Sequence, residues 1–177
     1  MSGLRASLGN ALDRDVQLRA ACWNVRTLLD TDRSMALKRR TAFVAKELQK
    51  YAIDFAAFSG TGSLKETVTD YTFFWSGVKE GQRRESGVAL KLSEKMVQLM
   101  CGPPECIGER LMIVKLKIAE GETLHLLSVY ASTLQAKGSK KEEFYGMVDK
   151  TLRDIPERDR VLLLGDFNAR VDWHYWR

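Results

Sequence analysis

The sequence predicts an α/β fold, in which short buried strands alternate with two amphipathic helices. The N-terminal half has the order strand, helix, strand: an apolar stretch at 18–25, a helical pattern over 36–51 and a second apolar stretch at 53–58. This order favours a right-handed crossover between two parallel strands. Residues 71–77 and 86–93 then have the aromatic and alternating patterns typical of antiparallel strands.

Length and composition indicate one globular domain. The chain has 177 residues, of which 45% are hydrophobic and 9% aromatic, which is enough for a core. Residues 1–17 show no sustained period, so we expect a loose leader there, followed by a domain over 18–177. Lys and Arg outnumber Asp and Glu by 28 to 23, and the net charge of +5 mildly favours polyanionic partners.

Cysteine usage and hydropathy bound the cellular context. The three cysteines cannot all pair with one another, and only two histidines are present to help build a zinc site. No apolar run approaches the ~18 residues of a membrane span, and the N-terminus lacks a secretory signal. We therefore expect an intracellular chain, nuclear or cytoplasmic rather than secreted, with no structural metal, no membrane contact and no obligate protein partner.

The first helical pattern carries a row of apolar or small residues at spacings of four and three: Leu37, Thr41, Val44, Leu48 and Tyr51. The basic residues between them could face a phosphate backbone or form an ordinary solvated helix face. The loop 79–86 holds Lys79, Arg83 and Arg84. This loop could face DNA, or it could be a simple exposed hairpin loop.

The second half of the chain predicts an antiparallel pair of strands followed by a helix. The pair covers 109–119 and 122–130, where apolar residues alternate with polar ones. Ser139 and Glu142 have the spacing of a capping box, so the helix would begin at Ser139 and run on to Pro156.

Polar residues follow the apolar run 161–164, which has the pattern of a fully buried strand and is ended by Gly165. Because side chains alternate along an extended strand, Asp166 and Asn168 would point the same way and Phe167 would turn toward the core. A carboxylate and an amide at a strand end can orient a water molecule and hold a phosphate oxygen. An Asp/Asn turn closed by local hydrogen bonds is the alternative.

Two more polar residues lie at the ends of predicted strands. Asn24 comes at the end of the first strand, next to Trp23, and Tyr130 ends the strand 122–130. Taken singly, Asn24 could cap a turn and Tyr130 could be a core residue with a satisfied hydroxyl. Both lie where an α/β sheet places its ligand crevice.

Three motifs, in this order, resemble those of the endonuclease/exonuclease/phosphatase superfamily: Trp23-Asn24-Val25-Arg26-Thr27-Leu28, Ser128-Val129-Tyr130-Ala131 and Gly165-Asp166-Phe167-Asn168-Ala169-Arg170. More narrowly, the chain from about Arg19 onward resembles the endonuclease domain of non-LTR retrotransposons and the related craniofacial-development-protein-2-like proteins. The resemblance implies a deoxyribonuclease-I-like fold, which is a two-sheet α/β sandwich. It also implies a reverse-transcriptase-associated phosphodiesterase activity that cleaves DNA with Mg²⁺.

The resemblance also implies a role for each candidate residue. Asn24 would position the metal or the scissile phosphate, and Tyr130 would hydrogen-bond the phosphate. Asp166 would orient or deprotonate the attacking water, and Asn168 would steady the developing charge. By the same resemblance, Asn24, Asp166 and Asn168 would be the metal-binding residues, with weak binding of Mg²⁺.

Departures from the family pattern imply weak or absent catalysis. The family has Ser-Glu-Thr-Arg after its second strand, with Glu as the principal metal ligand, where this chain has Ser59-Gly60-Thr61-Gly62. The family's late Ser-Asp-His segment has no counterpart, because Asp172-Trp173-His174 follows the third motif too closely. Ser132 also replaces the usual Pro after Tyr-Ala.

Two functions therefore follow from the resemblance, for a sandwich that we expect to be incomplete at its C-terminus. The first is a Mg²⁺-dependent endonuclease domain of retrotransposon origin whose activity is weak or lost. The alternative is a non-catalytic nucleic-acid-binding or interaction remnant.

Overall fold

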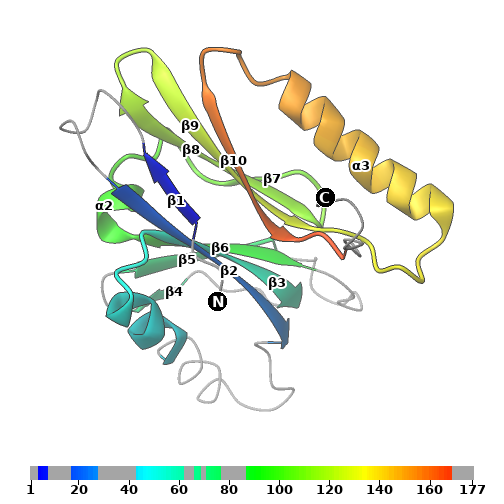
Figure 1. Cartoon of the computed structure of the whole chain (residues 1–177), viewed down its shortest axis with the longest axis horizontal. Coiled ribbons are helices and arrows are strands. Elements are labelled where there is room, and N and C mark those ends of the chain that lie inside the picture. Colours follow the sequence, from blue (N-terminus) through cyan, green and yellow to red (C-terminus); the bar gives the residue numbers. More distant parts are fainter. Residues whose placement is uncertain are drawn as a thin grey trace, which may run out of the picture.

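The computed structural model describes residues 4–7, 17–27, 43–61, 66–68, 71–76 and 87–168. These residues form two β-sheets packed face to face, with a long helix beside the smaller sheet (Figure 1). The predicted two-sheet α/β architecture is confirmed.

The larger sheet has six strands in the order β1-β2-β3-β6-β5-β4. Their bounds are β1 (Leu4–Ser7), β2 (Gln17–Thr27), β3 (Phe55–Thr61), β4 (Glu66–Val68), β5 (Tyr71–Trp75) and β6 (Val88–Ser93). β2 and β3 are parallel, with the helical segment 43–50 between them in the chain, and β5 and β6 are antiparallel. Both pairings agree with the sequence patterns.

The smaller sheet has four strands in the order β10-β9-β8-β7. Their bounds are β7 (Glu105–Cys106), β8 (Leu111–Ala119), β9 (Glu122–Tyr130) and β10 (Arg160–Asp166). β8 and β9 form the expected antiparallel pair, and β10 runs parallel to β9 after the helix α3 (Gly138–Arg153). The short helix α2 (Glu94–Val97) follows β6.

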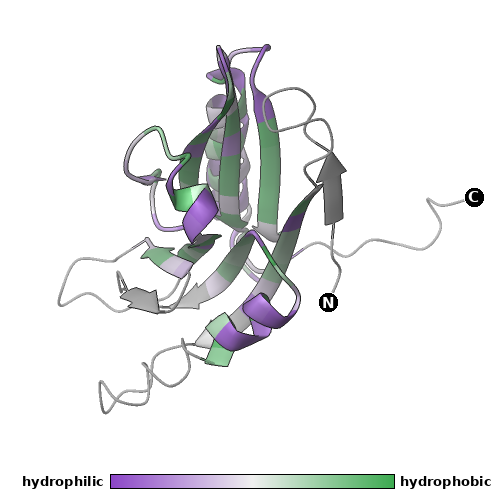
Figure 2. Ribbon diagram, turned by 90° about the vertical axis from the view of Figure 1, so that its left-hand side faces the viewer, coloured by the Kyte–Doolittle hydropathy of each residue, from purple (hydrophilic) through white to green (hydrophobic). Residues whose placement is uncertain are grey.

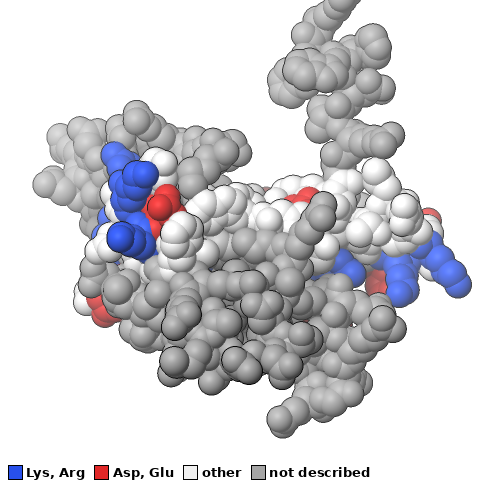
Figure 3. Space-filling view, turned by 90° about the horizontal axis from the view of Figure 1, so that it is seen from below, with Lys and Arg blue, Asp and Glu red and all other residues white. Residues whose placement is uncertain are grey.

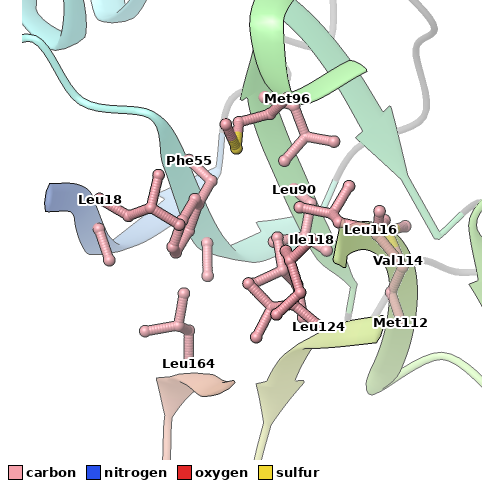
Figure 4. Close-up of a cluster of buried hydrophobic side chains, with 14 of the residues drawn as sticks. Leu18, Phe55, Leu90, Met96, Met112, Val114, Leu116, Ile118, Leu124 and Leu164 are labelled. Atoms are coloured by element: carbon pink, nitrogen blue, oxygen red, sulfur yellow. The ribbon is translucent and has the colours of Figure 1, made fainter. Parts of the chain in front are cut away.

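The main core lies between the two sheets (Figure 4). Leu18 and Phe55 reach it from the larger sheet, and Met112, Leu124 and Leu164 reach it from the smaller one. Hydrophobic residues follow the strands of both sheets, whereas hydrophilic residues gather at the turns and on the short helices (Figure 2). Burial of these apolar faces stabilises the sandwich and fixes which strand ends lie side by side.

The N-terminal region differs from expectation at Leu4–Ser7, which form β1 rather than part of a loose leader. β1 pairs antiparallel with the start of β2, whose outer edge offers free backbone groups to any short extended segment. Such pairing needs no hydrophobic pattern, which is why the sequence did not reveal it. Three expectations lie outside the described residues: the rest of 1–16, the loop with Lys79, Arg83 and Arg84, and the segment 172–174.

The capping box expected at Ser139 is wrong. α3 begins at Gly138, with Lys137 as its N-cap, and no side chain caps it by a hydrogen bond. Ser139 is already inside the first turn, so its hydroxyl is not at the cap position. Phe144 and Val148, on the face that the pattern predicts, are buried.

Two expected burials are also wrong. Tyr51 is 43% exposed because the helical segment has ended and the chain turns through Ala52, which has a φ of 49°. β10 is half-buried rather than fully buried, and Val161 is 41% exposed while Leu164 is covered. Among the described strands β10 pairs with β9 alone, so it lies at an edge of its sheet.

Candidate functional site

The carboxyl ends of β2, β9 and β10 meet at one end of the sandwich. Asn24 on β2 donates a hydrogen bond from Nδ2 to Oδ2 of Asp166 on β10, although 142 positions separate them in the chain. Tyr130, the last residue of β9, is in register with Asp166. The sequence-predicted residues Asn24, Tyr130 and Asp166 are therefore brought together from both sheets.

Gly165 allows β10 to lie against β9 just before Asp166. Its φ is +149°, and a Cβ atom built there would lie 1.9 Å from the carbonyl oxygen of Val129. No side chain fits in that space, so only glycine allows this approach. The position of Asp166 thus depends on the preceding residue being a glycine.

Asp166 and Asn168 form a tight local turn at the end of β10. Oδ1 of Asp166 accepts a hydrogen bond of 2.9 Å from the backbone N–H of Asn168, whose φ of 46° is left-handed. Nδ2 of Asn168 donates to the carbonyl oxygen of Ala131 at 2.8 Å. The Asp/Asn turn, which was the alternative interpretation of the sequence, is present. Long-range hydrogen bonds connect it to β2 and to the residue after β9.

The expectation for Phe167 is wrong, because this side chain is 37% exposed instead of turned toward the core. The reason is the left-handed residue Asn168, which ends the extended backbone on which strict alternation depends. Asp166 and Asn168 nevertheless come together, through the turn rather than through a shared strand face.

Asp166 also affects the thiol of Cys22, two residues before Asn24. Burial raises the pKa of Cys22, and the negative charge of Asp166 raises it further, while a hydrogen bond with the backbone of Gly165 opposes both effects. A thiol with a raised pKa is protonated near neutral pH and is a poor nucleophile. The chemistry of this site therefore centres on oxygen and amide groups.

The described residues do not fit a metal site made by the protein alone. Gly60 on β3 provides no side-chain oxygen, and its neighbour Ser59, in register with Asn24, has a buried hydroxyl with no hydrogen-bond partner among the described residues. In the part of the chain that the structure describes, no three His, Cys, Asp or Glu side chains come together as metal ligands. Asp166 is the carboxylate that the described hydrogen bonds bring to the two amides of Asn24 and Asn168.

Sequence reasoning missed Arg110, which lies just before β8 and contacts the end of β9. Its guanidinium group donates to the carbonyl oxygen of Tyr130 at 3.2 Å. The one signal for it in the sequence is the stretch Glu109-Arg110-Leu111-Met112 at the start of β8, which by itself assigns the arginine no role.

Comparison with solved structures identifies the fold. The chain superposes on humanized D. rerio TDP2 (TM-score 0.56, 18% identity, 85% of this chain and 62% of that one) and on D. rerio TDP2 complexed with single strand DNA product (0.55, 18%, 85% and 60%). It also superposes on the endonuclease domain of TRAS1, a telomere-specific non-LTR retrotransposon (0.53, 14%, 90% and 63%). The chain shares their fold.

The deoxyribonuclease-I-like sandwich expected from the resemblance is thereby confirmed. This chain spans about three fifths of the length of these structures, at 62%, 60% and 63%. No protein-family model matches it, and no curated protein sequence does. Among the described residues, no helix is long and apolar enough to cross a membrane.

Proposed function

We propose that this chain is a DNA-processing domain of the endonuclease fold, of retrotransposon origin, in which phosphodiester cleavage is weak or lost. The observation that carries the proposal is the hydrogen-bonded group of Asn24, Asp166 and Asn168 at the carboxyl ends of β2 and β10. Two similarities support it: one relative is a retrotransposon endonuclease domain, and another was crystallised with a single strand DNA product.

Each residue of the group has a task in phosphodiester hydrolysis. Asp166 orients or deprotonates the attacking water, and the donors from Asn24 and Asn168 hold its carboxylate in one orientation. The side-chain amide of Asn168 donates one N–H to the carbonyl oxygen of Ala131. Its other N–H can donate to the phosphate oxygen on which charge develops. Tyr130 supplies a hydroxyl to the same phosphate.

We also propose that this chain binds Mg²⁺ only weakly. Mg²⁺ in proteins is usually held by one or two carboxylates together with substrate phosphates and waters, and it polarises the phosphate when bound. The described residues bring no three His, Cys, Asp or Glu side chains together at this site, and Gly60 adds no carboxylate to Asp166.

Plasmid nicking in the presence of Mg²⁺ tests the proposal. We expect nicking barely above a protein-free control, because each ~1.36 kcal/mol of lost transition-state stabilisation slows the reaction about tenfold. The Asp166→Ala variant should abolish what remains. Nicking as fast as that of the TRAS1 domain would contradict the loss of activity, and nicking unaffected by Asp166→Ala would contradict the site.

Gly60 also favours the second candidate, a domain that binds DNA without cleaving it. Lys and Arg of the described residues stand in separated groups on the face shown in Figure 3, with acidic side chains beside them, so they form no continuous basic surface there.

A pure binder should keep its affinity in Asp166→Ala, whereas an Arg83→Ala and Arg84→Ala double variant should weaken binding and flatten its salt dependence. The reverse pattern would exclude this candidate.

A further inference from the structure

Arg110 makes four contacts with the last residue of β9 and with the residue after it. Its guanidinium carbon lies 5.1 Å from the centroid of the Tyr130 ring. One terminal nitrogen donates to the carbonyl oxygens of Tyr130 and Ala131, at 3.2 and 3.4 Å. The backbone carbonyl of Arg110 in turn accepts the N–H of Tyr130 at 2.9 Å.

The peptide groups that Arg110 contacts also hold the residues of the candidate site. The carbonyl oxygen of Ala131 accepts a hydrogen bond from Nδ2 of Asn168 as well as from Arg110. The N–H of Ala131 donates to the carbonyl oxygen of Asp166 at 2.8 Å. A rotation of the backbone at Ala131 would therefore displace Asn168 and Asp166 together with Tyr130.

The geometry requires arginine rather than a positive charge alone. Its partners are two neutral carbonyl oxygens and the face of an aromatic ring. A planar guanidinium can place its face over the ring while its N–H groups reach the carbonyls, and a lysine ammonium, which has no such plane, fits this set of partners less well.

We propose that Arg110 is a positioning residue, which fixes the backbone after β9 and thereby sets Tyr130 and Asn168 at the phosphate. Arg110 needs no contact with the nucleic acid for this role. The proposal rests on the proposed function for its consequence, although the contacts themselves can be tested without activity.

Fluorine NMR of the fluorotyrosine-labelled chain tests the contact directly, with the Tyr130 signal assigned by the Tyr130→Phe variant. Arg110→Ala should shift and broaden this signal, Arg110→Lys should fail to restore it, and added ethylguanidinium should restore it in Arg110→Ala. Arg160→Ala is the matched control, since Arg160 pairs with Glu122 at the other end of β9 and should leave the signal unchanged. An unchanged Tyr130 signal in Arg110→Ala and Arg110→Lys would overturn the proposal.

Binding of a short single-stranded oligothymidylate, measured in EDTA, tests the consequence. We expect Arg110→Lys and Tyr130→Phe each to weaken binding about threefold to tenfold, which is the range of one hydrogen bond. The double variant should lose no more affinity than the more strongly affected single variant. Fully additive losses would overturn the positioning role. If the parent chain does not bind at all, the proposed function fails, and the fluorine signal alone decides the role of Arg110.

Discussion

Gly165 shows how strongly a single residue constrains the candidate site. Its place against Val129 is fixed by sterics, since a Cβ atom would lie 2.7 Å from the carbonyl carbon of Val129 and 1.9 Å from its oxygen. The strand pattern marks this glycine only as the end of an apolar run. Its close contact with β9 becomes visible only when the parallel pairing of the two strands is known.

The Gly165→Ala variant should be less stable than the parent chain. We expect a loss of about 1–3 kcal/mol in the free energy of unfolding, because the methyl group forces β10 away from β9. Urea unfolding measures the loss. Gly146→Ala in α3 is the matched control, since its Cβ atom would meet nothing within 4 Å, and it should be neutral or stabilising. Equal stability of Gly165→Ala and the parent would contradict the described packing.

The closeness of Asn24, Tyr130 and Asp166 was predictable because each lies at or near the end of a strand that its own pattern reveals. Asn24, Tyr130 and Asp166 follow apolar runs, and the carboxyl ends of such strands meet at the crevice of an α/β sheet. Phe167 and Arg110 were not predictable in this way. The first depends on the left-handed backbone of Asn168, and the second on carbonyl groups 20 and 21 residues away.

At the scale of single elements, β6 carries a lysine where its alternating pattern predicts a solvent-facing position. Lys91 is fully buried, and its Nζ lies 4.6 Å from the centroid of the Tyr71 ring and 4.2 Å from that of Phe73. No described residue accepts a hydrogen bond from it. Burial lowers the pKa of Lys91 to about 7. The pattern failed because Tyr71 and Phe73, on the neighbouring strand β5, cover the face of β6 that carries Lys91.

Lys91→Met should therefore stabilise the chain. A buried donor without a partner costs about 1–3 kcal/mol, and methionine fills a similar volume without the charge. Thermal or urea unfolding at pH 7 should show a gain of that size. Lys117→Met, at an exposed position of β8, is the control and should change stability little. A less stable Lys91→Met would mean that the two ring contacts outweigh the burial of the amine.

The advantage of Lys91→Met should also depend on pH. The pKa of Lys91 is about 7 in the folded chain, below the value of about 10.4 that an unfolded lysine has. Between these values the unfolded chain binds more protons, so the stability of the parent rises with pH. The gain should be largest at or below pH 7 and shrink toward pH 10. A constant gain over this window would contradict the lowered pKa.

At the scale of the whole molecule, β10 is an edge strand of the smaller sheet, and its cover is incomplete. β10 pairs with β9 alone among the described strands, and Leu162 and Leu163 are only partly buried. Unpaired strand edges invite association, and small unfilled spaces in a core each cost about 1 kcal/mol. We expect marginal stability and poor solubility. Sharp two-state unfolding of a highly stable monomer would contradict this expectation.

The Val161→Lys variant tests whether β10 is the site of association. A charged side chain at an exposed edge position discourages strand pairing, so this variant should stay monomeric at higher concentration than the parent. Leu134→Lys is the control, because Leu134 is 55% exposed and lies outside every strand. Light scattering after size exclusion compares them. If both substitutions raise the concentration at which the chain stays monomeric by the same amount, the cause is a general gain in solubility and not the edge of β10.

The central claim is that this chain has an endonuclease site that lacks its metal carboxylate. Gly60 follows Ser59, which is in register with Asn24 on the neighbouring strand, so the backbone at position 60 lies beside the strand that carries Asn24. Gly60→Glu would return a carboxylate there. Because this variant adds one carboxylate and no second partner for the metal, we expect nicking to recover only in part.

Titration calorimetry with Mg²⁺ on the parent chain and on Gly60→Glu tests this claim most directly. Circular dichroism should first show that both chains are equally well folded. We predict a measurable gain in Mg²⁺ affinity for Gly60→Glu, and loss of that gain when Asp166→Ala is added. Identical Mg²⁺ binding by the parent and Gly60→Glu would contradict the claim, and with it the role assigned to Asn24.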